Sequence, residues 1–308
     1  PFALGATLTQ HGPLILPCEV KPMKVGAHVS AAAPLAKCVD RACDIGAEAI
    51  QIFASGPQSW RPGAHTEEAM AALKSHAEEC GIDTVFLHGV YLVNLATADE
   101  TLLNRSVGSL KQYLKFCGAT GARGTIFHVG SHKGSGFDGV LPQIAASIGR
   151  VLEATLPETW LILENSAGQG GTVGGRFAEL AAIIDAVGSE RVKVCLDTCH
   201  LYAAGYDIAT PAGCDATMEE FGQTVGLDRL VAVHANDSKA GLGSGLDRHE
   251  NIGEGQIGRE GFRVITGHPA FQPLPFILEV PGYEGKGPDR RNVETLRAIC
   301  VESGALAG

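Results

Sequence analysis

The chain has 308 residues, of which 45% are hydrophobic and 19% charged, and its formal net charge is −10. This composition supports a large folded core and excludes an intrinsically disordered chain. No apolar run reaches the ~18 residues of a membrane span, and the acidic balance argues against a protein that holds nucleic acid by a broad basic face.

Eight short apolar or β-branched runs predict strands, at residues 25–29, 49–53, 84–88, 124–129, 160–164, 192–197, 230–236 and 276–280. The stretches between them have helical spacing and predict helices at residues 35–46, 67–80, 102–118, 141–156, 176–187 and 293–303. Uninterrupted apolar strands that alternate with helices predict a buried parallel sheet. Eight such units without a linker favour an α/β fold: a single (β/α)8 TIM barrel with elongated C-terminal-face loops. Residues 239–261 are expected to form one long glycine-rich loop.

An open, doubly wound sheet is the alternative fold, but no G-x-G-x-x-G follows the first predicted strand. Residues 1–22 lack the basic start and the apolar segment of a signal peptide. We interpret them as an N-terminal extension or an expression remnant, and residues 23–308 as the barrel domain. The nine cysteines are scattered and odd in number, which favours a reducing, intracellular setting in which most of them are buried packing residues.

Acidic and histidine side chains recur where the predicted strands end. They are His28, His88, His128, Glu164, Asp197, His234 and Glu279. His200 is expected in the loop after Asp197, and the glycine-rich loop adds Asp247 and His249. Cys195 is expected to face the same side as Asp197, one layer deeper in the barrel, and Cys199 is given no ligand role.

Each of these residues alone has an ordinary explanation, as a hydrogen-bonded histidine or as the cap of the next helix. Together they would bury several charges around one mouth without a counter-charge, which is costly. Divalent cations remove that cost. Five histidines, two aspartates and two glutamates, with His28 left aside, suit two or three metal ions better than a single zinc with three or four ligands. Such a cluster is typical of phosphoryl transfer, and its mixed N/O donors favour zinc, with manganese or iron as alternatives.

Several motifs, in the same order along the chain, resemble those of a known family. They are GAHVSAA at 26–32, HGVYLVNL at 88–95, LENSAGQG at 163–170, CLDTCH at 195–200 with AAGYD at 203–207, HANDSK at 234–239, DRHENIGEG at 247–255 and ILEVP at 277–281. On these motifs the chain resembles the endonuclease IV family, the zinc-dependent apurinic/apyrimidinic endonucleases of DNA base-excision repair. The resemblance covers about residues 25–303.

The resemblance implies a hydrolase with three zinc ions, with manganese or iron an alternative at one of the sites. It would cut DNA 5′ to an abasic site, leaving a 3′-hydroxyl and a 5′-deoxyribose phosphate, and would also trim blocked 3′ ends. The implied partner is double-stranded DNA carrying abasic sites or blocked 3′ ends. The chain is expected to be a cytoplasmic monomer, associated with the nucleoid when it acts on DNA, without a membrane partner.

Carried over position by position, the resemblance implies three sets of metal ligands: His88, His128 and Glu164; Glu164, Asp197, His234 and Glu279; and His200, Asp247 and His249. It implies that a hydroxide held between the first two ions attacks phosphorus, with Glu164 and Glu279 as the catalytic residues that orient it. The third ion would stabilise the leaving oxygen.

The expected DNA-binding residues are Gln58, Tyr91, Leu92, Arg248 and His28. Tyr91 and Leu92 match the family's minor-groove wedge, although core packing is an equally good reading of the two side chains. The family usually has arginine where this chain has Gln58, and Arg61 is a candidate substitute. This departure puts wedging and duplex affinity in doubt, although it does not affect the chemistry.

Three other functions remain open at this point. A sugar isomerase or epimerase on a related barrel would need fewer metal ligands, so His200, Asp247 and His249 would be surplus. A metal-dependent amidohydrolase should carry His-x-His on its first strand and Asp on its last, where this chain has only His28 and Glu279. A catalytically silent DNA- or metal-binding barrel is the third, and Gln58 keeps it open.

Overall fold

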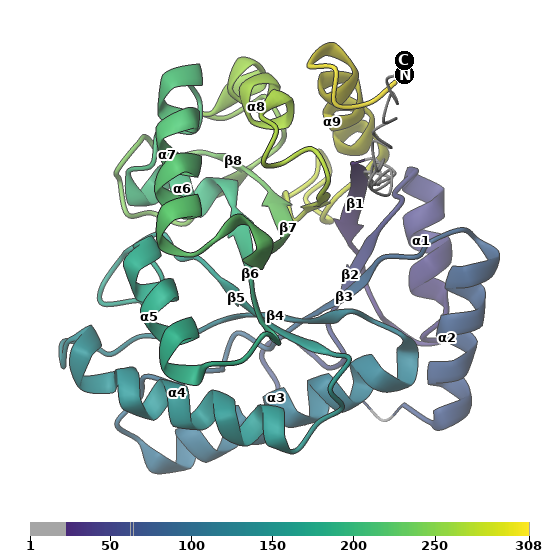
Figure 1. Cartoon of the computed structure of the whole chain (residues 1–308). Helices are drawn as coiled ribbons and strands as arrows, with labels where there is room; N and C mark the ends of the chain where they lie inside the picture. Colours follow the sequence, from purple (N-terminus) through teal and green to yellow (C-terminus); the bar gives the residue numbers. More distant parts are fainter. Residues whose placement is uncertain (1–22, 62, 64, 308) are drawn as a thin grey trace, which may run out of the picture.

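The computed structural model describes residues 23–61, 63 and 65–307. Its parallel strands close into a barrel in the order β1-β10-β7-β6-β5-β4-β3-β2, with helices packed around the outside (Figure 1). The barrel strands are β1 (Lys24–His28), β2 (Ile50–Ile52), β3 (Val85–His88), β4 (Gly124–His128), β5 (Trp160–Glu164), β6 (Val192–Asp197), β7 (Leu230–Ala235) and β10 (Pro275–Leu278). The predicted (β/α)8 barrel is confirmed, and each predicted strand lies within about two residues of its observed position.

Six helices correspond to the predicted ones: α1 (Lys37–Ile45), α2 (Glu67–Glu79), α3 (Glu100–Thr120), α4 (Phe137–Glu153), α5 (Phe177–Val187) and α9 (Arg290–Glu302). The sequence did not indicate α6 (Thr198–Ala204), α7 (Pro211–Thr224) or the 3-10 turn η1 (Leu227–Arg229). Among the described residues no helix is both long and apolar enough to span a membrane. The interpretation of residues 1–22 falls outside the described residues.

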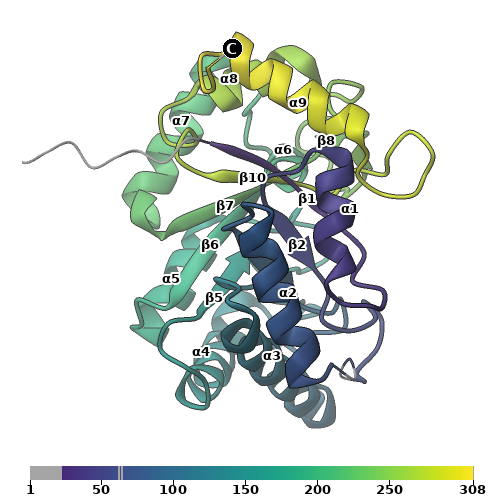
Figure 2. The ribbon, with the colours of Figure 1, turned by 90° about the vertical axis from the view of Figure 1, so that its right-hand side faces the viewer.

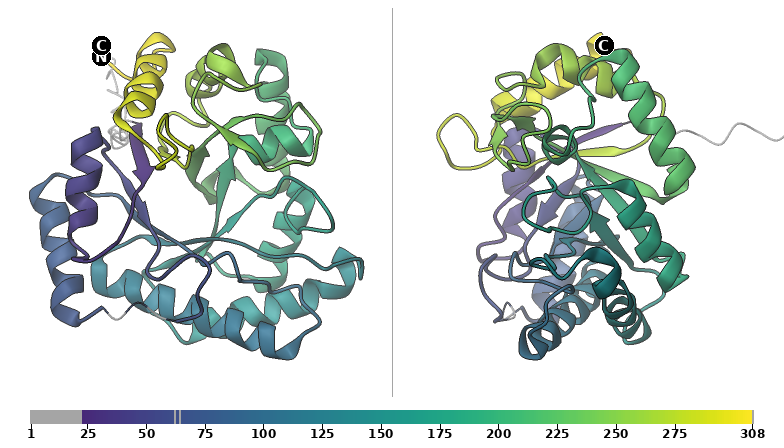
Figure 3. Two further views of the ribbon diagram at one scale, coloured as in Figure 1. Left: turned by 180° about the vertical axis from the view of Figure 1, so that it is seen from behind. Right: turned by 90° about the vertical axis from the view of Figure 1, so that its left-hand side faces the viewer.

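The expectation of one loop over residues 239–261 was partly wrong. β9 (His249–Glu250) pairs antiparallel with β8 (Asp237–Ser238), and α8 (Gly258–Gly267) begins inside the segment. The side view in Figure 2 shows α8 and α9 together at one end of the molecule, with the loop at residues 281–289 projecting outward. The two views of Figure 3 show the helical layer continuing around the barrel.

The interior of the barrel is filled below its mouth by a small apolar layer. Phe86, Ile126, Ile162, Cys195 and Ala232 form this cluster and are all fully buried. They come from five consecutive barrel strands, β3 to β7, and Cys195 takes the deeper position expected for it. Because side chains fill this part of the barrel, the acidic and histidine side chains of the strand ends lie at the rim above it.

Asp237, on β8, organises the loop that leads into α8. This fully buried carboxylate accepts backbone N–H groups of Gly253 and Gly255 on Oδ2 and of Ile257 on Oδ1, each at 3.0 Å. The N–H of Gly258, the first residue of α8, lies 3.2–3.3 Å from both oxygens. A Cβ on Gly255 would lie 2.4 Å from Asp237 Oδ1, so this close approach requires glycine.

We therefore expect Asp237→Asn to destabilise the protein by about 3 kcal/mol, because an amide nitrogen would face donors and leave buried N–H groups without an acceptor. Denaturant unfolding of the variant and the native protein under identical conditions measures the effect. Asp215→Asn is the matched control, because Asp215 is exposed and its carboxylate lies 3.5 Å from His268 Nε2 at the surface. Equal midpoints for the two variants would contradict the role given to Asp237.

Candidate metal centre

The polar side chains at the strand ends converge on one mouth of the barrel. His28, His88, His128, Glu164 and Asp197 are the last residues of their strands, His234 is the next to last of β7, and Glu279 follows β10 directly. Parallel strands present their C-terminal ends at a single rim, so the alternation of strands and helices alone brings these groups together.

Three of the imidazoles each donate one ring N–H to a backbone carbonyl. Nδ1 lies 2.7 Å from such an oxygen in His88, 3.0 Å in His200 and 3.3 Å in His249. A carbonyl oxygen can only accept, so the proton lies on Nδ1 and each Nε2 keeps a lone pair when the ring is neutral. Fixing one nitrogen in this way is how metal-binding histidines are held.

Glu164 lies between two pairs of imidazoles. Its Oε2 is 3.1 Å from His88 Nε2 and 3.4 Å from His128 Nε2. Its Oε1 is 3.1 Å from His234 Nδ1 and 3.4 Å from His200 Nδ1. Burial would raise the pKa of Glu164, but these imidazoles outweigh it and hold the pKa well below its ordinary value. The carboxylate is therefore ionised, and its two oxygens can serve neighbouring cations.

Glu164 also belongs to two groups whose potential ligand atoms all lie within 4.8 Å of one another. The first group is His88, Glu164, His234 and Glu279, and the second is His128, Glu164 and His200. The first two ligand sets expected from the sequence divide these residues differently from the two observed groups. In both divisions Glu164 is the member common to the two sets. The structure thus brings the members of the first two sets, except Asp197, around one carboxylate, whereas Asp197 is grouped with Cys199 and His249.

The third set, His200, Asp247 and His249, forms a group of its own within the same limit. His200 Nε2 lies 3.3 Å from Asp247 Oδ2, and His249 Nε2 lies 3.2 Å from Oδ1. Both nitrogens are buried, and among the described residues neither has a hydrogen-bond partner. A lone pair that faces a carboxylate oxygen is unfavourable unless a cation or an extra proton lies between them. The residues present therefore fit a metal ion.

His200 lies in a helix and not in the expected loop. Asp197 is the N-cap of α6, because its Oδ1 accepts the backbone N–H of His200 at 2.9 Å. Its Oδ2 accepts from the side-chain amide of Asn236 at 2.6 Å and lies 3.7 Å from His249 Nε2. The ordinary role of a helix cap and a role in the centre are thus combined in one side chain.

Cys199 lies closer to the centre than the sequence indicated. Its Sγ is within 4.8 Å of the potential ligand atoms of Asp197 and His249. Burial raises the pKa of the Cys199 thiol to about 12, which favours the protonated form over the thiolate that binds metals. The interpretation of Cys199 as a packing residue agrees with this.

A cavity of about 630 Å³ opens beside the centre. Tyr91 and Leu92 line it together with the candidate ligands His128, His200 and Asp247. Tyr91 is 56% exposed, whereas Leu92 is half-buried and packs against the hydrophobic core. The core-packing reading of this pair is therefore wrong for Tyr91. The structure places both side chains where a ligand in the cavity would meet them.

The other expected DNA-binding residues lie on the loops that flank the mouth. Gln58 is exposed, and its loop is joined to the next by the N–H of Tyr91, which donates to the carbonyl of Pro57 at 3.0 Å. Arg248 is exposed beside Asp247. The structure thus gathers these residues at the same end of the barrel as the candidate ligands.

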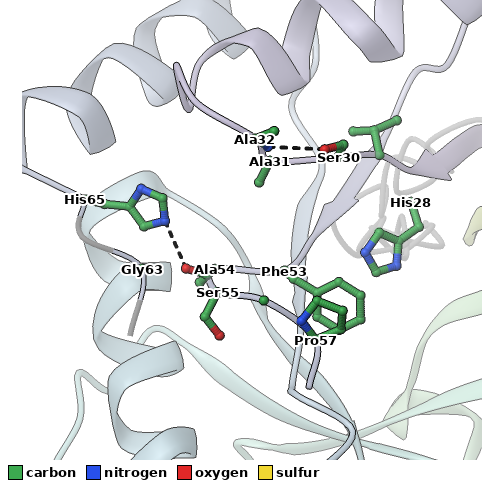
Figure 4. Close-up of a pocket in the computed structure, with 12 residues that line it drawn as sticks. His28, Ser30, Ala31, Ala32, Phe53, Ala54, Ser55, Pro57, Gly63 and His65 are labelled. Atoms are coloured by element: carbon green, nitrogen blue, oxygen red, sulfur yellow. Dashed lines mark hydrogen bonds between the residues drawn. The ribbon is translucent and has the colours of Figure 1, made fainter. Parts of the chain in front are cut away.

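His28 lies where the centre meets a second pocket. This pocket, of about 490 Å³, lies between the loops that follow β1 and β2, and Figure 4 shows His28, Phe53 and Pro57 on one side of it. His28 Nδ1 is 2.9 Å from Glu279 Oε1, and its ring lies 4.5 Å from that of Phe53, centroid to centroid. His28 is therefore the residue shared by the centre and the pocket.

Sequence reasoning missed three amide side chains that hold the candidate ligands. Asn165 Oδ1 accepts the backbone N–H of Asp197 at 2.6 Å, and Asn236 Oδ1 accepts that of Glu279 at 2.9 Å. Gln51 contacts both His234 and Glu279. Asn165 and Asn236 directly follow or closely follow predicted ligands, a signal that could have found them, whereas Gln51 lies between two isoleucines in a predicted strand.

Comparisons with known proteins identify relatives over most of the chain. A family profile described as "Xylose isomerase-like TIM barrel" matches residues 39–299. The chain is 39% identical over 276 residues to the "Probable endonuclease 4" of Halothermothrix orenii, covering 89% of this chain and 99% of that protein. It is 41% identical over 266 residues to the protein of the same name from Chlorobium phaeovibrioides, covering 85% and 95%.

Solved structures with the same fold include an endonuclease IV and an epimerase-like protein. The crystal structure of endonuclease IV from Thermus thermophilus superposes with a TM-score of 0.80 at 35% identity, covering 91% of this chain and 99% of that one. A D-tagatose 3-epimerase-like protein superposes with a TM-score of 0.67 at 18% identity, covering 91% and 97%. At that identity the second likeness concerns the fold alone.

Proposed function

The chain belongs to the endonuclease IV family and is a nuclease of the hydrolase class, and we propose that it cuts DNA 5′ to abasic sites during base-excision repair. The expected products are a 3′-hydroxyl and a 5′-deoxyribose phosphate, and blocked 3′ ends are proposed as further substrates. The observation that carries the proposal is the set of imidazole nitrogens that face carboxylates in adjoining groups at the barrel mouth. A monomer that acts in the cytoplasm, at the nucleoid, is part of the same proposal.

Family membership implies the use of divalent metal, and we propose three zinc ions. The proposed ligand sets are those named above: His88, His128 and Glu164; Glu164, Asp197, His234 and Glu279; and His200, Asp247 and His249. When bound, such ions supply an activated water and neutralise charge on the phosphate and on the leaving oxygen. The mixed imidazole and carboxylate donors support zinc, with manganese or iron as the alternatives.

The protein's own groups have separate tasks in this proposal. Glu164 holds the first two sets together, since each of its oxygens faces a different pair of imidazoles. Glu279 directs Oε2 toward His234 Nδ1 at 3.3 Å and Oε1 toward His28 at 2.9 Å, so it is positioned to orient the attacking water and accept its proton. His28 keeps that carboxylate in place and reaches the adjoining pocket.

Substrate selection is assigned to the rim of the mouth. The exposed ring of Tyr91 and the half-buried Leu92 are proposed to enter the minor groove and displace the abasic sugar into the cavity they line. Arg248 is proposed to contact phosphate. Because the net charge is −10, duplex affinity must depend on the bound cations and on a few such residues.

Incubation with a duplex that contains one tetrahydrofuran abasic analogue, followed by mapping of the product ends, tests the proposal. We expect one cut on the 5′ side of the analogue, a 3′-hydroxyl terminus, and no cut in the same duplex without the lesion. Metal content near three zinc ions per chain is expected in the same preparation. One metal per chain and no cleavage would instead favour a sugar isomerase or epimerase.

Gln58→Arg is expected to tighten binding to the abasic duplex about threefold to tenfold and to steepen the salt dependence by about one phosphate contact. The reason is that residue 58 is exposed beside the loop that carries Tyr91, where a cation would reach the duplex. Equilibrium binding at several salt concentrations measures the change. Gln223→Arg adds the same charge at the last turn of α7, at the opposite end of the barrel, and is the control. Equal effects of the two variants would contradict the DNA-binding role given to residue 58.

A further inference from the structure

Gln51 is a polar residue inside the barrel whose side-chain contacts all lead to the metal centre. It is the middle residue of β2 and is fully buried. Its Nε2 lies 2.6 Å from Glu279 Oε1 and 2.9 Å from His28 Nδ1, and its Oε1 lies 2.8 Å from His234 Nε2. A buried amide between two isoleucines is costly unless its hydrogen bonds are satisfied, so these contacts explain its presence.

The chemistry of its partners fixes which way the amide points. The ionised carboxylate of Glu279 can only accept, so the NH2 group of Gln51 must face it. The amide oxygen then faces His234 Nε2, and because that oxygen also only accepts, Nε2 must carry the proton. The remaining nitrogen, Nδ1, lies 3.1 Å from Glu164 Oε1 and 3.3 Å from Glu279 Oε2, toward the centre.

His234 is held differently from its neighbours. His88, His200 and His249 donate to backbone carbonyls, which no substitution removes. In His234 the proton position depends on a side chain, Gln51, from another strand of the barrel. The same side chain supplies a donor to Glu279, so one residue controls two candidate ligands.

We propose that Gln51 is a positioning residue of the nuclease centre, which presents His234 Nδ1 and Glu279 to the cation. The inference rests on the proposed function, since it concerns the same centre, but it concerns how zinc is bound and not which bond is cut. Removing an outer hydrogen-bond partner of this kind typically lowers metal affinity or activity about 10–100-fold.

Gln51→Met tests the proposal, because methionine has a similar length and fills the apolar surroundings but offers neither the acceptor nor the donor. We expect zinc affinity, measured by competition with a chelator, to fall about 10–100-fold at one ion of the set. Long-range ¹H–¹⁵N spectra of the zinc-loaded protein should show His234 with its proton on Nε2 in the wild type and with that pattern altered in the variant. On the abasic duplex, kcat should fall while KM stays within about twofold, because Gln51 is fully buried and does not reach DNA.

Gln51→Glu separates the two contacts. A carboxylate at position 51 still accepts from His234 Nε2, so the His234 tautomer should persist, but it repels Glu279 across the 2.6 Å contact. Zinc affinity and kcat should therefore fall without a change in the His234 spectrum. If Gln51→Met does not fold, Gln51→Glu alone tests whether position 51 affects zinc affinity and kcat.

Thr125→Val is the control, because Thr125 is fully buried on β4 and its side chain contacts Cys117 Sγ at 3.4 Å, away from the centre. It should leave zinc affinity and the His234 spectrum unchanged. Wild-type zinc affinity and an unaltered spectrum in both Gln51 variants would overturn the inference. The zinc and spectral measurements need no DNA, so a failure of the proposed cleavage reaction would be seen separately, in the wild-type protein.

Discussion

Glu279→Gln is expected to lower the cleavage rate of an abasic duplex by about 10³-fold while leaving duplex binding intact. Burial would raise the pKa of Glu279, but His234 and His28 hold it well below its ordinary value, so the native side chain is a carboxylate. The neutral amide loses that charge. If its nitrogen takes the place of Oε1, it meets the NH2 of Gln51, and if it takes the place of Oε2, it faces His234 and the proposed cation.

Single-turnover cleavage and equilibrium binding, both at measured zinc content, separate the two effects. Glu254→Gln is the matched control, because Glu254 is an exposed carboxylate at the barrel end that contacts Tyr283 and Arg291 and no candidate ligand. Turnover of Glu279→Gln at the wild-type rate would remove Glu279 from the mechanism. Loss of zinc from the variant would instead assign it to metal binding alone.

Stripping the metal with a chelator is expected to abolish activity and to make stability strongly dependent on pH. Without cations, protons must separate the imidazoles from the carboxylates. Burial would lower the pKa of His249, but Asp197 and Asp247 raise it to about 9. The pKa values of His200 and His234 are also raised well above the ordinary one by nearby acidic groups, against the effect of burial.

A pKa raised in the folded state contributes stability that is complete below the unfolded value of about 6.5 and is lost as pH rises through the folded value. The metal-free protein should therefore lose stability between about pH 6.5 and pH 9. Binding of the proposed zinc ions needs neutral imidazoles, so it should become tighter over the same range. The difference in Tm between the zinc-loaded and metal-free protein should widen from pH 6 to pH 9, and a constant difference would contradict this account of the centre.

The fold and the convergence of the candidate ligands on one rim were predictable because strong local signals coincide with the architecture. Continuous apolar strands such as the one at 160–164 are recognisable without tertiary information, and the observed β5 has those same bounds. Once eight strands run parallel in a barrel, the C-terminal residue of each must lie on one rim. Glu164 and Asp197 therefore lie on the same rim, although nothing in the local sequence around either residue indicates that they are neighbours.

What the sequence concealed depends on tertiary contacts. The helix α6 has only seven residues between its cap, Asp197, and Gly205, which is too short for a periodic pattern. α7 contains two glycines and begins at Pro211, so its helical propensity is weak. The role of Gln51 could not be recognised from the sequence, because its partners, His234 and Glu279, are remote along the chain. They contact Gln51 only when β1, β2, β7 and β10 close the barrel.

The carboxylate of Asp197 has two roles. Its Oδ1 accepts the backbone N–H of His200 and so caps α6, while its Oδ2 faces His249 Nε2. The helix that carries His200 is therefore started by a group belonging to the centre, and the centre receives His200 only when that helix has formed. The order of the first turn of α6 and the position of His200 in the centre therefore depend on the same carboxylate. A substitution that removes the Asp197 carboxylate would therefore remove the cap of α6 and a group of the centre at the same time.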